Sequence, residues 1–204
     1  NLVARARAAV PRPQGLASTL EKNLPVAAGR GGGSADAGAV FRMVEELHGL
    51  PDDWQERAAK LGADVPSCVR SEMAIGTGTG TELTEIDNDL AGTPVLLVNP
   101  RVPLSTGPVF KAWDQIDRGP LPQGSARFIA MQGRNDLQAP ALSQCPAIGD
   151  VLDALRGTEA WLARMSGAGA SSFALFDTEE QREAAKSHIN EIHPQWWMLG
   201  GRLR

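Results

Sequence analysis

The hydrophobic positions of the chain recur with helical spacing in several stretches. Val40, Phe41, Val44 and Leu47 fall on one face of a helix that ends before residues 49–51 (GLP), because side chains three and four residues apart share a helix face. The same spacing predicts four further helices: residues 2–10; residues 52–61, with Trp54, Ala58 and Leu61 on one face; residues 148–155; and residues 178–188.

Apolar runs and alternating segments predict strands between these helices. Residues 94–100 (PVLLVNP) form a short apolar run typical of a buried strand. Residues 16–24 (LASTLEKNL) alternate and predict a strand that leads into a glycine cluster. The remaining predictions are a hairpin over residues 72–86 with Gly76–Gly80 at its tip, two strands at 161–165 and 173–176 joined by a glycine turn, and a terminal strand at 193–198.

Composition and charge exclude several classes of protein. With 204 residues, 42% of them hydrophobic, the chain can bury one large or two small cores. A net charge of −4 without a basic patch argues against a nucleic-acid or membrane-surface binder. No apolar run approaches the ~18 residues of a membrane-spanning helix, and no signal peptide is visible. We therefore expect a cytoplasmic protein.

The cysteines and histidines do not predict a disulfide or a metal site. Cys68 and Cys145 stand far apart in the sequence and are interpreted as small buried side chains. His48, His188 and His193 lack neighbours at metal-ligand spacing, so we expect no zinc site.

The glycine cluster at residues 29–34 (GRGGGS) predicts a phosphate-binding loop. Glycine leaves backbone N–H groups uncovered, and the cluster runs directly into the helix whose N-terminus favours anions. Pro25 fixes the direction in which the chain enters. The spacing fits neither a P-loop nor a dinucleotide-binding fingerprint. The alternative is a flexible turn or linker.

Three segments together resemble the GHMP small-molecule kinases. Residues 25–37 (PVAAGRGGGSADA) resemble the second motif of that family, residues 61–66 (LGADVP) its catalytic aspartate motif, and residues 164–173 (RMSGAGASSF) its third, glycine-rich motif. Their order and spacing match the family over nearly the whole chain. The triple glycine followed by Ser-x-Asp-Ala is the variant of the member that acts in non-mevalonate isoprenoid (terpenoid) biosynthesis.

The resemblance implies an α+β fold of two domains. Residues 1–90 would be a partial N-terminal ATP-binding domain of the ribosomal protein S5 domain 2-like type, and residues 91–204 a ferredoxin-like C-terminal domain. The chain starts at Asn1 without an initiator methionine and enters a helix at once. By comparison with the family, we expect about the first quarter of the enzyme to be absent, including a lysine that pairs with the catalytic aspartate.

Asp64 is the candidate catalytic residue. It follows a helix and precedes Pro66, on a turn that we expect to lie close to a buried strand. A carboxylate held there could accept the proton of an attacking hydroxyl or orient that hydroxyl towards a γ-phosphate. The alternative is an aspartate that only caps a turn.

The resemblance also implies which residues bind ATP and the acceptor. Asn1 and Leu2 match positions that touch adenine, and Lys22 matches a lysine that contacts the purine, although it could equally be a solvated strand lysine. Phe110 would stack on a cytosine ring with Thr106 nearby, or else be a core aromatic of an amphipathic helix. The predicted ATP-binding residues are Asn1, Leu2, Lys22, Pro25, Gly29, Gly31, Gly32, Gly33 and Ser34, and the predicted acceptor-binding residues are Thr106, Phe110, Gly167 and Gly169.

The implied reaction is transfer of the γ-phosphate of ATP, with Mg²⁺, to the 2-hydroxyl of 4-diphosphocytidyl-2-C-methyl-D-erythritol. The expected partner is this small molecule, without nucleic acid or membrane, and the chain is expected to be a monomer or weak homodimer. Two alternatives stay open: another GHMP small-molecule kinase, or a non-catalytic nucleotide-binding module. The second is suggested by the expected absence of the N-terminal region and by Arg30, where the family usually has leucine.

Overall fold

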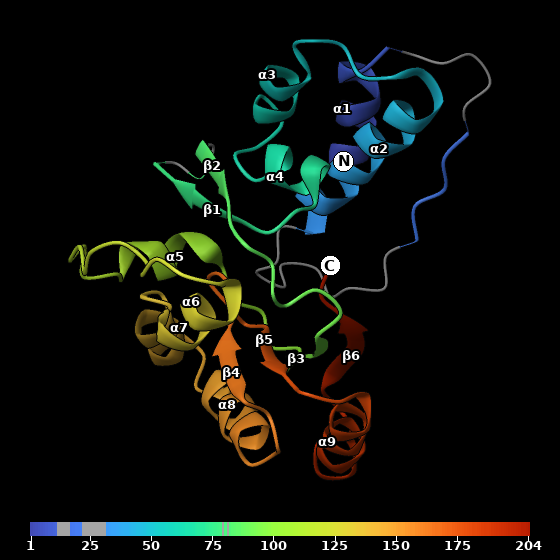
Figure 1. Cartoon of the computed structure of the whole chain (residues 1–204). Helices are drawn as coiled ribbons and strands as arrows, with labels where there is room; N and C mark the ends of the chain where they lie inside the picture. The colour runs from blue at the N-terminus through green and yellow to red at the C-terminus, as the bar shows by residue number, and fades with distance from the viewer. Residues whose placement is uncertain (12–16, 22–31, 79, 81) are drawn as a thin grey trace. The chain divides into compact units, whose positions relative to one another are not determined.

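The computed structural model describes residues 1–11, 17–21, 32–78, 80 and 82–204 (Figure 1). Its contacts divide the chain into two compact units. The described residues up to Asp87 form unit 1, and Asn88–Arg204 form unit 2. In the described part of the chain, no helix combines the length and the apolar character needed to cross a bilayer.

Unit 1 is a group of helices followed by one hairpin. Ala6, Phe41, Val44 and Val65 are among the side chains of its core, so three elements contribute to a single apolar cluster. The elements are α1 (Leu2–Ala9), α2 (Gly32–His48), α3 (Trp54–Ala59), α4 (Val65–Arg70), β1 (Ala74–Thr77) and β2 (Glu82–Glu85).

The helical periodicity of unit 1 is confirmed except at one position. Val40, Phe41 and Val44 are buried as predicted, whereas Leu47 is 56% exposed. Leu47 lies in the last turn of α2, where the described part of the chain leaves its side chain uncovered. Gly49 follows the helix with φ +75°, a conformation that glycine adopts without strain.

Two local predictions in unit 1 are wrong. Residues 17–21, the described part of the predicted strand, have no regular structure, because a strand needs a partner and the described strands of unit 1, β1 and β2, pair with each other. The turn at Asp64 leads into the helix α4 and not into the buried strand that we expected close to it. Pro66 does not prevent this, because a helix tolerates proline in its first turn. The predicted hairpin is confirmed, with β1 and β2 antiparallel.

Unit 2 contains an antiparallel sheet with the strand order β4-β5-β3-β6. The chain runs strand, helices, strand, strand, helix, strand, and in this order the first and third strands are the central ones, which is the ferredoxin-like arrangement that we expected. The elements are β3 (Pro94–Asn99), α5 (Thr106–Lys111), α6 (Ala126–Gln132), α7 (Gln138–Gln144), α8 (Ala147–Arg156), β4 (Leu162–Met165), β5 (Ser172–Leu175), α9 (Glu179–Ile192) and β6 (Trp197–Arg202).

Helix α8 joins the two apolar clusters of unit 2. Val151 and Leu155 pack in one cluster with Leu96 of the central strand β3, while Ile148 and Leu152 pack in a second cluster with residues of α5, α7 and the β4–β5 turn. All four α8 positions are buried, which confirms the predicted periodicity. In Figure 1, α8 and α9 lie next to each other beside the sheet.

Charged side chains fix α9 and the last strand. The buried Arg182 donates to Gly201 O (2.9 Å) and to Glu179 (2.7 Å), and Arg202 also pairs with Glu179. Hydrogen bonds from Arg202 and then Arg182 lower the pKa of Glu179. The last strand lies later than predicted, because His193 ends α9 and its ring stacks on Trp196 with centroids 3.7 Å apart.

Candidate active site

The first turn of α2 contains the described part of the predicted phosphate-binding loop. Gly32, Gly33 and Ser34 open this 17-residue helix. The first backbone N–H groups of a helix have no intrahelical partner, and the helix dipole makes this end favourable for phosphate. Lys22, Pro25, Gly29 and Gly31, which were also predicted to bind ATP, lie outside the described residues.

The N-terminus of α1 lies against the same turn. A Cβ atom at Gly33 would come within 3.0 Å of Leu2 Cδ1, so the absence of a side chain at Gly33 allows the half-buried Leu2 to contact the turn. Asn1 begins α1, because its side-chain Oδ1 accepts a hydrogen bond from the Val3 N–H (3.0 Å). Three of the predicted nucleotide positions, Asn1, Leu2 and Gly33, are therefore neighbours in unit 1.

Asp64 lies on the turn that borders Ser34. A Cβ atom at Gly62 would lie 3.9 Å from Ser34 Oγ, so the α3–α4 turn passes close to the first turn of α2. Asp64 is exposed and precedes α4, and its side chain makes no capping hydrogen bond. Its backbone is held, since Asp64 O accepts from Ser67 Oγ (2.8 Å) and from Cys68 N (3.1 Å). The carboxylate is thus on a fixed backbone and not engaged by its own helix.

Close packing between α2 and α4 fixes the position of this turn. A Cβ at Gly38 of α2 would lie 2.5 Å from Cys68 O and 2.6 Å from Cys68 C, far inside contact distance. Arg42, one turn later on α2, donates to Cys68 O. Only glycine at position 38 permits this approach. From the sequence we did not identify Gly38 or Arg42 as residues that position the turn. An isolated glycine inside a helical pattern was the available signal.

The charge of Asp64 contributes to the pKa of the Cys68 thiol. Burial, and then the nearby Asp64 carboxylate, raise the pKa of Cys68. A neighbouring negative charge disfavours the thiolate, so this thiol is not set up as a nucleophile.

The predicted cytosine-binding residues lie on α5 of unit 2. Thr106 begins this helix and is exposed, and Phe110 is 53% exposed. The alternative that Phe110 is a core aromatic is wrong, because the fully buried side chain of α5 is Val109. Exposure leaves the Phe110 ring available for stacking on a ligand.

The glycine turn between β4 and β5 has one exposed and one buried glycine. Gly167 is exposed with φ +53°, and Gly169 is buried with φ +85°. A Cβ at Gly169 would lie 3.0 Å from Met165 Sδ and 3.2 Å from Leu104 Cδ2. Gly169 therefore lets the turn fold onto the core, while Gly167 presents its backbone to solvent.

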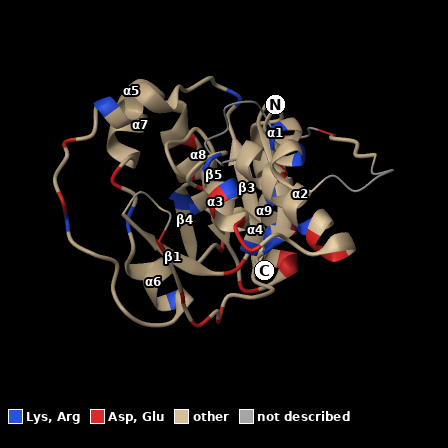
Figure 2. Ribbon diagram, turned by 90° about the horizontal axis from the view of Figure 1, so that it is seen from above, with Lys and Arg blue, Asp and Glu red and all other residues tan. Residues whose placement is uncertain are grey.

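Among the described residues, no group of three or more histidine, cysteine, aspartate or glutamate side chains could hold a metal ion. Lysine and arginine are interspersed with aspartate and glutamate along the ribbon (Figure 2). The described residues thus offer a helix N-terminus, an exposed carboxylate on the turn next to it, and, in unit 2, an exposed aromatic ring and a glycine turn.

Two family models match the chain. The model for the GHMP kinases N terminal domain matches residues 1–72, and the model for GHMP kinases C terminal matches residues 123–195. The first therefore contains α1–α4 with the candidate phosphate and Asp64 positions, and the second contains the β4–β5 turn.

Curated relatives and solved structures agree with these matches. The 4-diphosphocytidyl-2-C-methyl-D-erythritol kinase of Novosphingobium aromaticivorans is 66% identical over 204 residues, covering all of this chain and 70% of the relative. That of Erythrobacter litoralis is 62% identical and covers all of this chain and 76% of the relative.

A crystal structure of 4-(cytidine 5'-diphospho)-2C-methyl-D-erythritol kinase matches with a TM-score of 0.80 and 27% identity, over 98% of this chain and 77% of that one. A homoserine kinase from Cytophaga hutchinsonii matches with a TM-score of 0.68 over 89% of this chain and 68% of that one, and at 14% identity it supports the fold alone. With two motif-bearing domain matches and relatives above 60% identity, the chain belongs to the 4-diphosphocytidyl-2-C-methyl-D-erythritol kinases of the GHMP kinase family.

Proposed function

We propose that this chain carries the reaction named by its relatives, transfer of the γ-phosphate of ATP to the 2-hydroxyl of 4-diphosphocytidyl-2-C-methyl-D-erythritol. The observation that carries the proposal is the meeting of three segments in unit 1. Leu2 and the Gly62–Asp64 turn both border the first turn of α2, as the close approaches at Gly33 and Gly62 indicate. A phosphate donor bound at this helix end would have a carboxylate close by.

The residues of unit 1 would divide the work between binding and proton transfer. The N–H groups of Gly32, Gly33 and Ser34 would donate hydrogen bonds to the phosphates. These donors would stabilise the negative charge that develops on the phosphate oxygens in the transition state. Asp64 would orient the acceptor hydroxyl and take its proton as the new P–O bond forms. Most of the rate enhancement would come from positioning and charge stabilisation, as is usual for phosphoryl transfer.

Mg²⁺ fits this arrangement as an ion carried by the nucleotide. Such sites use phosphate oxygens, waters and one or two carboxylates, and the described residues provide Asp64 but no cluster of metal ligands. The ion would neutralise phosphate charge when bound. Every other contribution would come from the chain itself.

In unit 2, Phe110 would stack on the cytosine ring with Thr106 nearby, and the backbone at Gly167 and Gly169 would contact the acceptor. Stacking on a base is worth about 1–3 kcal/mol, which is sufficient to affect affinity. The half-exposed ring of Phe110 supports this role. We further propose a monomer or weak homodimer that acts in the cytoplasm without a nucleic-acid partner, in keeping with the interspersed charges (Figure 2).

Phosphoryl transfer to the cytidine-linked acceptor tests the proposal. We would assay this chain alone and this chain extended at its N-terminus by the corresponding segment of the Novosphingobium relative. Asp64→Asn in the active form should lower kcat by about 10²–10⁴. Asp53→Asn is the matched control, because Asp53 also precedes a helix and makes no capping hydrogen bond, and its surface ion pair with Arg57 is worth about 0–1 kcal/mol.

The outcomes separate the alternatives. Transfer that is lost with Asp64→Asn and kept with Asp53→Asn supports the proposed reaction. ATP binding without transfer to any alcohol would indicate a non-catalytic module, and transfer that cytidine nucleotides do not inhibit would indicate a different acceptor.

A further inference from the structure

Asn135 holds the β4–β5 turn from one side. Its side-chain Nδ2 donates to Met165 O (2.9 Å) and to Gly167 O (2.8 Å), while its Oδ1 accepts from the Leu137 N–H (3.0 Å). Both amide hydrogens and the carbonyl oxygen are therefore used. The two acceptors are the last residue of β4 and the exposed glycine of the turn, which lie 30 and 32 residues away in the sequence.

Asn99 holds the other end of the same turn. Its Nδ2 donates to Ser171 Oγ (2.8 Å) and its Oδ1 accepts from the Arg101 N–H (2.7 Å). Asn99 is 3% exposed and Ser171 is fully buried, so no water competes for this hydrogen bond. Asparagine side chains thus fix both ends of the segment that runs from Met165 to Ser171.

Other contacts hold the buried part of the turn, where Ala168 and Ala170 pack in the apolar cluster of α5, α7 and α8. Inside the turn, Ser166 N donates to Ser171 O (2.9 Å) and Gly169 N donates to Ser166 O (3.0 Å). Gly169 packs against the core, as described above, but Gly167 is exposed and lies in the left-handed region. At Gly167, the exposed residue of the turn, the hydrogen bond from Asn135 orients the carbonyl group.

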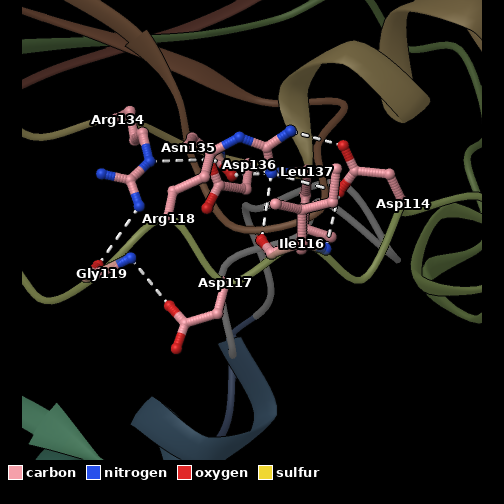
Figure 3. A network of polar contacts seen from close by, with 9 residues as sticks. All are labelled: Asp114, Ile116, Asp117, Arg118, Gly119, Arg134, Asn135, Asp136 and Leu137. Atoms are coloured by element: carbon pink, nitrogen blue, oxygen red, sulfur yellow. Dashed lines mark hydrogen bonds and ion pairs between the residues drawn. The ribbon is translucent and has the colours of Figure 1, made fainter.

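A charged network in turn fixes Asn135 (Figure 3). Its neighbour Asp136 pairs with Arg134 (2.9 Å) and lies 4.0 Å from Arg118, and Arg134 also donates to Gly119 O (3.3 Å). The segment around Asn135 is thereby tied to the loop that carries Arg118 and Gly119. Partly exposed ion pairs of this kind are individually weak, but together they limit the positions that Asn135 can take.

We propose that Asn135, supported by Asn99, is a positioning residue for the acceptor. The C=O and N–H of one trans peptide point in opposite directions, so holding Gly167 O towards Asn135 turns the Ala168 N–H away from it. That N–H is then held as a donor on the face of the turn opposite Asn135. The inference rests on the proposed function, in which this turn contacts the acceptor.

Asn135→Asp is the variant that tests it. The substitution keeps the acceptor for the Leu137 N–H and replaces both donors to the turn by a carboxylate oxygen. We expect KM for the cytidine-linked acceptor to rise up to about tenfold, the loss expected when the Ala168 N–H no longer makes its one hydrogen bond to the acceptor, with KM for ATP unchanged. The enzyme used is the form that shows transfer in the assay above.

Asn88→Asp is the matched control. Asn88 makes a smaller set of the same kind of contacts, with Oδ1 accepting from the Leu90 N–H (3.2 Å) and Nδ2 donating once, to Arg204 O (2.8 Å), but it does not touch the turn. Asn88→Asp should lower the free energy of unfolding by about half as much, because one donated hydrogen bond is lost instead of two, and it should leave KM unchanged. Ser171→Ala, which removes the partner of Asn99, is a second variant that should raise KM for the acceptor if Asn135→Asp fails to fold.

A pH profile separates positioning from a general loss of structure. Two carbonyl oxygens facing the new carboxylate disfavour its charged form, and the protonated carboxyl can donate one hydrogen bond again. KM of Asn135→Asp, divided by that of the parent at each pH, should therefore fall as the pH is lowered, while the Asn88→Asp ratio stays constant.

Unchanged KM in both Asn135→Asp and Ser171→Ala, in an enzyme that transfers phosphate normally, would overturn the inference and leave the proposed function standing. If neither the chain alone nor its extended form transfers phosphate, both the inference and the proposed function are overturned.

Discussion

Replacing Gly38 by alanine tests the idea that α2–α4 packing positions Asp64. The added Cβ would lie 2.5 Å from Cys68 O, 2.6 Å from Cys68 C and 2.8 Å from Cys68 Cβ, where ordinary contact begins at 3.4 Å. Two of these atoms belong to the backbone, so no side-chain rotation can relieve the clash. The helix α4 must therefore move by roughly 1 Å, and it must take Asp64 with it.

The expected cost follows from two opposing effects. Overpacking of this kind costs about 1–3 kcal/mol or more, and alanine in a helix interior regains up to about 1 kcal/mol relative to glycine. Because the clash is with backbone, we take the upper end and expect the free energy of unfolding to fall by about 2 kcal/mol. In a chain of this size that lowers the melting temperature by roughly 4–8 °C.

The assay is thermal and urea unfolding, with kcat measured on the folded enzyme. Gly149→Ala in α8 is the control, since its Cβ would meet only Leu142 Cδ2 at 3.5 Å, and it should be neutral or stabilising by up to about 1 kcal/mol. We expect Gly38→Ala also to lower kcat, because Asp64 is displaced. If Gly38→Ala gains stability as Gly149→Ala does and keeps full kcat, the packing argument is refuted.

Three further outcomes are expected. Gly33→Ala should raise KM for ATP severalfold, because the added methyl group lies at the proposed phosphate-binding turn. The melting temperature should change little, because this Cβ meets only the flexible end of Leu2 at 3.0 Å. An unchanged KM would argue against phosphate binding at this turn. Because two arginines lower the pKa of Glu179, its contribution to stability is present above its unfolded pKa of about 4.3 and is lost as the pH falls below it. In Glu179→Gln the melting temperature should therefore fall less than in the parent as the pH is lowered from about 5 to about 3. Parallel plots of melting temperature against pH for the two proteins would contradict this. Finally, Asp64→Asn should lower the pKa of Cys68 and speed its alkylation by iodoacetamide near neutral pH, and an unchanged rate would mean that the carboxylate does not face the thiol.

Periodicity predicted most of the elements, because the relevant information is local. The buried face of α8 and the run of β3 were readable from residues a few positions apart, and both are confirmed. The strand predicted at residues 16–24 shows the limit of this reasoning. Alternation favours a strand, but pairing decides whether one forms, and the described part of that segment finds no partner.

The candidate site was predictable where motifs carry it and not where packing does. The glycines of α2 and the aspartate at position 64 stand in recognisable patterns. The long-range contacts of Gly38 and Asn135 could not be predicted in this way, because they are made with residues 30 positions away, Cys68 and Met165. Sequence spacing indicates which face a side chain is on, but it does not identify which element lies opposite.

The strand order of unit 2 has a consequence for how this unit folds. The central strand β3 pairs with β6, and about a hundred residues separate paired positions such as Pro94 and Arg202. The strands β4 and β5, in contrast, pair across a short turn. Closing the longer loop costs about 2 kcal/mol more in chain entropy, so the β4–β5 hairpin should form early and β6 should dock last. Until β6 arrives, one edge of β3 offers unpaired N–H and C=O groups. Partly folded copies of the protein are therefore expected to associate through this edge, and aggregation during refolding should increase with protein concentration.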